Sequence, residues 1–155
     1  MDVTIKTKEL YLKYKEIRDK VEEIEEEIKD YAEKNGAYIT DYRRSLDRKK
    51  QDWMDKWRAL TDFVYNFIAE QIEVKRGQRE FEIWGKTYVI KDREVEVSLG
   101  WKNGKGKEWS YECINGESDL SNHTYDTKGD LVRMVNYDIK QKTWIKMLDE
   151  GKKQI

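Results

Sequence analysis

The sequence predicts an α+β fold: an N-terminal antiparallel helical hairpin, a four-stranded antiparallel sheet and a C-terminal helix. Apolar residues recur at alternating spacings of four and three along the first half of the chain, which is the period of an amphipathic helix. From residue 79 the period changes to two, as expected of half-buried strands. The length of 155 residues fits a single domain, residues 1–155, from which a helical arm protrudes.

The first predicted helix covers residues 7–34. Thr7 is a suitable N-cap, and Asn35 with Gly36 supplies the left-handed residue that ends a helix. The charged residues of this segment surround one apolar seam, which is typical of a coiled coil. The seam consists of Leu10, Tyr14, Ile17, Val21, Ile24, Ile28 and Tyr31.

The second predicted helix covers residues 41–75, begins at Thr40 or Asp41 and ends before Gly77. The short connection predicts a coiled-coil-like antiparallel hairpin, the helical arm. In that register, facing residues have numbers that sum to about 75. The acidic run of Glu22–Glu27 then faces the cations of residues 48–50.

The predicted sheet covers residues 79–114. Phe81–Trp84 and Thr87–Ile90 form a hairpin with a turn at Gly85-Lys86. Trp84 and Tyr88 are predicted to be out of phase with Phe81, Ile83 and Val89, so aromatic side chains are expected on both faces of the sheet. Residues 95–101 and 109–113 supply the other two strands, and the loop Lys102–Lys107 joins them. Residues 115–126 are predicted to be turn and loop.

The last predicted helix covers residues 127–150. Asp126 or Thr127 caps its start, and Gly151 lies past its end. Its apolar residues occupy more than one stripe, so the helix is expected to pack on the sheet and to touch the arm.

Composition argues against an enzyme or a metalloprotein. The chain has one cysteine, Cys113, and one histidine, His123, which are too few for a zinc site of Cys and His ligands. The 31 basic and 32 acidic residues nearly cancel, which disfavours non-specific binding to nucleic acid. We therefore expect no catalytic residue, no cofactor and no metal.

Surplus aromatic and basic residues are the candidates for binding a partner, because Trp, Tyr and Arg concentrate binding energy at interfaces. A plain basic hairpin tip is the competing interpretation of the loop after Trp101. The candidate residues are Trp84, Trp101 and Trp109, with Lys102, Lys105 and Lys107 of the loop and the cluster Lys75, Arg76 and Arg79.

The Lys-, Glu-, Asn- and Tyr-rich composition, as in Tyr31–Ile39, and the lack of a catalytic motif resemble small phage- and mobile-element-encoded inhibitors of CRISPR nucleases. The resemblance implies a stoichiometric inhibitor that binds another protein. The alternative is a nucleic-acid-binding accessory protein that uses the basic loop and the cluster at residues 75–79. Without a signal-peptide core or a membrane-spanning segment, the protein is expected in the cytoplasm, that of the host cell if a phage encodes it.

Overall fold

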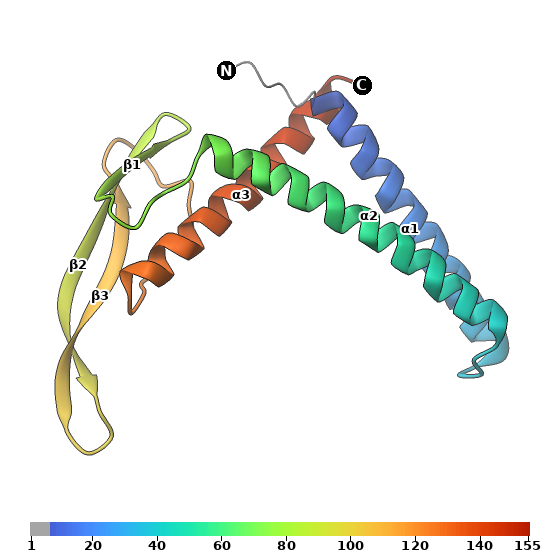
Figure 1. Cartoon of the computed structure of the whole chain (residues 1–155), viewed down its shortest axis with the longest axis horizontal. Coiled ribbons are helices and arrows are strands. Elements are labelled where there is room, and N and C mark those ends of the chain that lie inside the picture. The colour runs from blue at the N-terminus through green and yellow to red at the C-terminus, as the bar shows by residue number, and fades with distance from the viewer. Residues whose placement is uncertain (1–6) are drawn as a thin grey trace. The chain divides into compact units, whose positions relative to one another are not determined.

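The computed structural model describes residues 7–155, which form three α-helices and one three-stranded antiparallel sheet (Figure 1). The elements in chain order are α1 (Thr7–Asn35), α2 (Asp41–Gln71), β1 (Glu80–Ile83), β2 (Lys86–Ser98), β3 (Asn103–Cys113) and α3 (Lys128–Lys153). The chain divides into two compact units. The helical unit contains the chain up to Asn66 and Trp144–Ile155, and the sheet unit contains Phe67–Thr143. The α+β class predicted from the sequence is confirmed.

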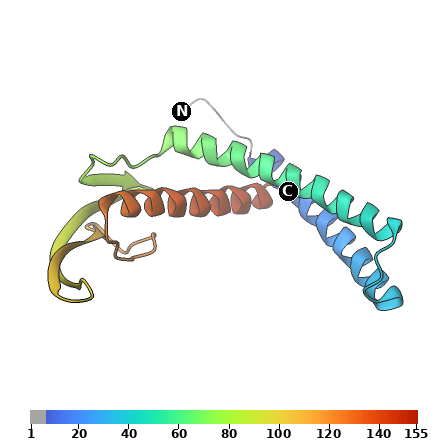
Figure 2. The ribbon, with the colours of Figure 1, turned by 60° about the horizontal axis from the view of Figure 1, so that its bottom comes forward.

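In the helical unit, α1 and α2 lie side by side and run in opposite directions (Figures 1 and 2). The rings of Tyr14 and Trp57 lie 5.5 Å apart near one end, and those of Tyr31 and Tyr42 lie 5.9 Å apart near the other. The four seam residues that lie deepest are aliphatic: Leu10, Ile24, Leu46 and Val64. Their burial removes apolar surface from water along the whole length of the pair.

The connection between α1 and α2 uses the residues expected of helix ends. Gly36 has φ +63°, and its N–H donates to the carbonyl of Ala32 at 2.8 Å, which closes α1. The Thr40 hydroxyl accepts a hydrogen bond from the Arg43 N–H at 3.4 Å, so Thr40 caps α2. Tyr31 Oη donates to the same hydroxyl at 2.8 Å and ties α1 to the cap.

The predicted neutralisation of the acidic run by α2 is limited. Lys50 Nζ lies 3.2 Å from Glu25 Oε1 and forms the expected cross-helix ion pair. Arg43 and Arg44, nearer the start of α2, bind carboxylates of α2 itself, those of Asp47 and Asp41. Partners one turn away on the same helix are always within reach, so they compete with the facing helix.

The second helix ends at Gln71, four residues before the predicted limit, so Lys75 is not helical. The Asn136 side chain of α3 accepts a hydrogen bond from the Val74 N–H at 2.8 Å and donates to the Val74 carbonyl at 2.9 Å. These two bonds replace the helical partners of Val74, which is itself buried. The helix therefore stops where a distant side chain takes over its backbone groups.

The prediction of four strands is wrong, because β2 is one continuous strand in the sheet order β1–β2–β3. Residues 91–94 contain no turn-forming glycine or asparagine, and each pairs with β3. The predicted loop Lys102–Lys107 is also wrong, since all but its first residue lie in β3.

The turn between β1 and β2 consists of Trp84 and Gly85, with φ +52° and +77°, and not of Gly85 and Lys86. Positive φ at both central residues defines the turn type that matches the twist of two paired strands. Directly opposed residues of an antiparallel pair share a face, so the pairing of Tyr88 with Phe81 places Tyr88 on the core face, where its ring stacks on Phe81 at 5.1 Å. The prediction that Tyr88 faces away from the core is therefore wrong.

The core of the sheet unit forms between one sheet face and α3. Phe81, Tyr88 and Tyr111 are buried on the sheet face, with Leu131 and Val135 buried on the helix. Thr127 caps α3, because its hydroxyl accepts the Asp130 N–H at 3.0 Å.

In the helical unit, the last part of α3 contributes a ring cluster in which Trp144 lies 6.3 Å from Tyr14 and 6.2 Å from Trp57. The helix continues to Lys153, so Gly151 lies inside it and not past its end.

Candidate interaction surface

Beyond β1, strands β2 and β3 continue as a two-stranded ribbon, residues 91–110, which is drawn as the long twisted arm of the sheet in Figure 1. Strand β1 pairs with residues 86–89 of β2 and no further. The register of the ribbon places Asp92 opposite Trp109 and Ser98 opposite Asn103. A two-stranded ribbon has little apolar surface to bury, so cross-strand side-chain contacts must support it.

Ion pairs run along both faces of the ribbon. On one face Lys105 Nζ lies 3.2 Å from Glu94, and Lys107 Nζ lies 3.2 Å from Asp92. On the other face the Arg93 guanidinium donates to Glu108 at 2.8 and 2.9 Å. Each exposed pair contributes about 0.2–1 kcal/mol, and the paired charges largely cancel at a distance. The two predicted binding lysines of β3 therefore neutralise carboxylates of β2.

The glycines of β3 allow the side chains of Val97 in β2 and of Leu99 just after β2 to lie over the backbone of β3. A β-carbon at Gly106 would lie 3.2 Å from Val97 Cγ1, and one at Gly104 would lie 2.9 Å from Leu99 Cδ1. Glycine thus serves close packing within a strand here, whereas the sequence interpretation assigned these residues to the loop between two strands.

The tip of the ribbon is the four-residue loop from Leu99 to Lys102, in which the Leu99 N–H donates to the Lys102 carbonyl at 2.8 Å. Gly100 has φ +86°. The Trp101 side chain is 83 % exposed, and Lys102 Nζ lies 4.7 Å from the centre of its ring. A large aromatic side chain held in water at a strand-supported tip is available to a partner.

Trp109 lies at the other end of the ribbon, next to α3. Its backbone exchanges two hydrogen bonds with Tyr125, at 2.7 and 2.8 Å. Lys107 and Lys128 place their ammonium groups 5.8 and 5.7 Å from the centre of its ring, within cation–π range. Arg76 lies nearby at the start of α3, since its Nη2 would be 3.4 Å from a β-carbon at Gly129.

The structure therefore separates the predicted site residues into four places. Trp101 and Lys102 occupy the tip, whereas Lys105, Lys107 and Trp109 lie along the ribbon. Lys75, Arg76 and Arg79 are exposed in the segment between α2 and β1, and Trp84 occupies the β1–β2 turn. The sequence analysis did not identify Lys128 as a candidate. A lysine in the first turn of a helix is unfavourable next to the positive end of the helix dipole, so its position there could have indicated a role in binding.

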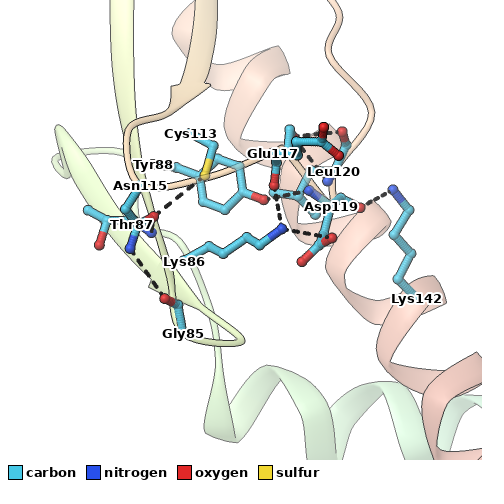
Figure 3. A network of polar contacts seen from close by, with 11 residues as sticks. Gly85, Lys86, Thr87, Tyr88, Cys113, Asn115, Glu117, Asp119, Leu120 and Lys142 are labelled. Carbon is cyan, nitrogen blue, oxygen red and sulfur yellow. Dashed lines mark hydrogen bonds and ion pairs between the residues drawn. The ribbon is translucent and has the colours of Figure 1, made fainter.

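A polar network holds the loop after β3 against β2 and α3 (Figure 3). Lys86 Nζ donates to the Glu117 carbonyl and to Asp119 Oδ1, the latter at 3.2 Å. Tyr88 Oη accepts the Asp119 N–H at 2.8 Å, and Lys142 donates to the Asp119 carbonyl. These four contacts bind either the backbone of Glu117 and Asp119 or the Asp119 carboxylate, so they hold the loop in position.

Burial raises the pKa of the Tyr111 hydroxyl above its usual value, with smaller contributions from Tyr125 and Asp138. Burial and then Asp138 raise the pKa of Tyr125 as well. Both hydroxyls are thus protonated at neutral pH and cannot act as bases there.

Residues 7–155 contain no cluster of three or more His, Cys, Asp or Glu side chains that could hold a metal ion. His123 is exposed in the loop before α3. No helix in the same range is long and apolar enough to cross a membrane. No protein-family model, curated protein or solved structure matches the chain.

Proposed function

We propose that the protein is a non-enzymatic binding module that inserts the ribbon tip into a cleft of a partner protein. The observation that carries this proposal is the 83 % exposure of Trp101 at the end of a ribbon in which Arg93, Lys105 and Lys107 are paired with carboxylates. Burying an indole ring in a partner's pocket is the kind of contact that dominates protein–protein affinity. The internal ion pairs leave little net charge to attract phosphates, which favours a protein partner over nucleic acid.

The partner we propose is a nucleic-acid-processing enzyme of the host cell, of the CRISPR nuclease kind, which the protein inhibits stoichiometrically in the cytoplasm. The support for this choice is the resemblance of the sequence to inhibitors of that class. In the same proposal, the α1–α2 pair is a coiled-coil-like hairpin that serves as a rigid arm.

The test is a DNA-cleavage assay with a panel of RNA-guided nucleases and increasing amounts of the protein. Inhibition that is complete near one equivalent supports the proposal, and inhibition far below one equivalent indicates an enzyme. Trp101→Ala should weaken inhibition at least tenfold, which corresponds to about 1.4 kcal/mol. Tyr38→Ala is the matched control, because Tyr38 is an aromatic residue with 77 % exposure in the α1–α2 connection. Equal inhibition by both variants would exclude Trp101 as the anchor.

A second candidate function, binding to nucleic acid, is favoured by the exposed cations of the Lys75–Arg79 segment together with Lys128. Among the described residues, Lys75, Arg76, Arg79 and Lys128 form no ion pair with a carboxylate within 4.0 Å, so their charges are available to phosphates. Binding of this kind weakens with salt, with a logarithmic slope of about −0.9 per phosphate contact on duplex DNA. Arg76→Glu should abolish it, whereas Trp101→Ala should leave it unchanged, so the two functions are separable.

A further inference from the structure

Most carboxylates of the acidic run, Glu22–Glu27, have no cationic partner among the described residues. Within residues 7–155, Glu25 pairs with Lys50, and Glu23 pairs at 3.7 Å with Lys20 of its own helix. The carboxylates of Glu22, Glu26 and Glu27 form no ion pair within 4.0 Å in this part of the chain. Like charges one turn apart on a helix destabilise it, so this face of α1 favours an incoming positive charge.

An apolar groove of about 310 Å³ lies beside the acidic run, entirely within the helical unit. Tyr14, Val21, Met54 and Trp57 line it from α1 and α2. Met54 is 39 % exposed, although it is a residue that normally fills a core. The groove is therefore an apolar flank of the helix pair that the described residues leave open.

The rim of the groove carries one cation and one anion on the same helix. Arg18 and Glu22 both line the groove and are four residues apart on α1. Lys15 and Glu26 extend the same exposed face by one turn in each direction, because residues three or four apart share a helix face. Asp19, whose Oδ1 lies 3.7 Å from Arg18 Nη2, stands between the two ends of this face, so that Lys15 and Arg18 form its basic end and Glu22 and Glu26 its acidic end.

We infer that the groove is the contact surface of a two-fold symmetric dimer, in which α1 of one copy packs antiparallel against α1 of the other. A two-fold axis near residue 20 places Arg18 opposite Glu22 of the partner subunit, and Lys15 opposite Glu26 of the partner subunit. Each contact occurs twice, as an isologous interface requires. The axis also brings the two copies of Val21 together, and the apolar flanks of two helix pairs then cover each other as in a four-helix bundle.

A second copy fits this groove better than a partner of one charge sign. A basic partner would meet Arg18 and Lys15, and an acidic partner would meet the glutamates. The reversed copy of the same helix satisfies both ends at equal spacing. The inference concerns the helical unit alone and does not depend on the proposed function of the ribbon.

The test is sedimentation equilibrium of the full chain at about 100 µM, where an interface with a Kd near 1 µM is almost fully occupied. The wild-type protein should sediment at twice the chain mass of 18.8 kDa. The variants Arg18→Glu and Glu22→Arg should each sediment as monomers, because each presents four like charges at the axis. Lys49→Glu is the control that should remain dimeric, since Lys49 is exposed on α2 one turn before Trp53, which lines a different groove.

Mixing the two single variants gives the decisive result. An Arg18→Glu chain carries two acidic residues at the axis and a Glu22→Arg chain carries two basic ones, so the mixture should form a heterodimer. Contacts within a single α1 helix cannot produce this result, because each variant alone is expected to be a monomer. Circular dichroism of each variant checks that its helices remain folded. A wild-type protein that stays at the chain mass, single variants that remain dimeric, or folded variants that stay monomeric when mixed would each overturn the inference.

Discussion

Gly151 of α3 packs directly on Thr7 at the start of α1. A β-carbon at Gly151 would overlap the carbonyl oxygen of Thr7 and lie 2.8 Å from Tyr11 Cβ. Gly151 is fully buried although it belongs to the last turn of a helix. The absence of a side chain at this position therefore sets how closely the two helix ends approach.

The first prediction is that Gly151→Ala destabilises the protein by about 1–3 kcal/mol, the usual cost of adding a methyl group to a packed site. The obstructing Thr7 atom belongs to the backbone, so it cannot move aside as a flexible side chain would. Gly77→Ala is the control, because no atom lies within 4 Å of its added carbon. Urea denaturation of both variants measures the difference, and equal stability would contradict the close contact.

Gly151 also shows which parts of the fold the sequence could predict. The helices of residues 7–35, 41–71 and 128–153 were found because apolar periodicity and capping residues are local signals. A glycine near a helix end is ambiguous, since it equally suits a terminator and a close contact with a distant segment. The contact with Thr7 joins opposite ends of the chain, so no local pattern could distinguish the two roles.

The position at which α2 ends is also set by a contact between residues far apart in the sequence, that of Asn136 with Val74. We predict that Asn136→Ala costs about 1–3 kcal/mol, because it leaves the buried backbone groups of Val74 without their two partners. Amide hydrogen exchange at Val74 should accelerate in the same variant. Asn122→Ala is the control, since Asn122 is exposed in the loop before α3. Unchanged exchange at Val74 would mean that the Asn136 side chain does not hold this backbone.

The candidate surface was predictable in composition but not in arrangement. The sequence identified Trp101, Lys102 and Lys107 as candidates for binding but placed Trp101 at the end of a strand, whereas it lies in the exposed tip loop. The sequence analysis assigned the glycines of β3 to a loop. The packing of Val97 against Gly106 becomes visible only when the register of the two strands is known. The proximity of Arg76 to α3 likewise depends on tertiary packing.

The third prediction concerns alkaline pH. The pKa of Tyr111 is raised in the folded protein, so its contribution to stability is complete below the ordinary tyrosine pKa of 10.0 and is lost as pH rises through the folded value. The free energy of unfolding of the wild type should therefore decrease above pH about 10 more steeply than that of Tyr111→Phe. Guanidinium denaturation at pH 8 and pH 11 measures the difference.

Tyr38→Phe is the reference for this measurement, because the Tyr38 side chain is 77 % exposed. Removing its hydroxyl should leave the pH dependence of the wild type intact. If Tyr111→Phe and the wild type lost stability in parallel, the Tyr111 hydroxyl would titrate alike in the folded and unfolded chains.

The last prediction concerns the ion pairs that support the ribbon. Arg93 donates through two nitrogens to one oxygen of Glu108, whose side chain is 27 % exposed. A double-mutant cycle with Arg93→Ala and Glu108→Ala should give a coupling of about 0.2–1 kcal/mol at low salt. The coupling should fall towards zero at 1 M salt, where the screening length is about 3 Å. The same salt increase should leave the Phe81–Tyr88 stack intact, because that contact is apolar. A coupling that persists at high salt would mean that Arg93 supports the ribbon by packing its aliphatic stem.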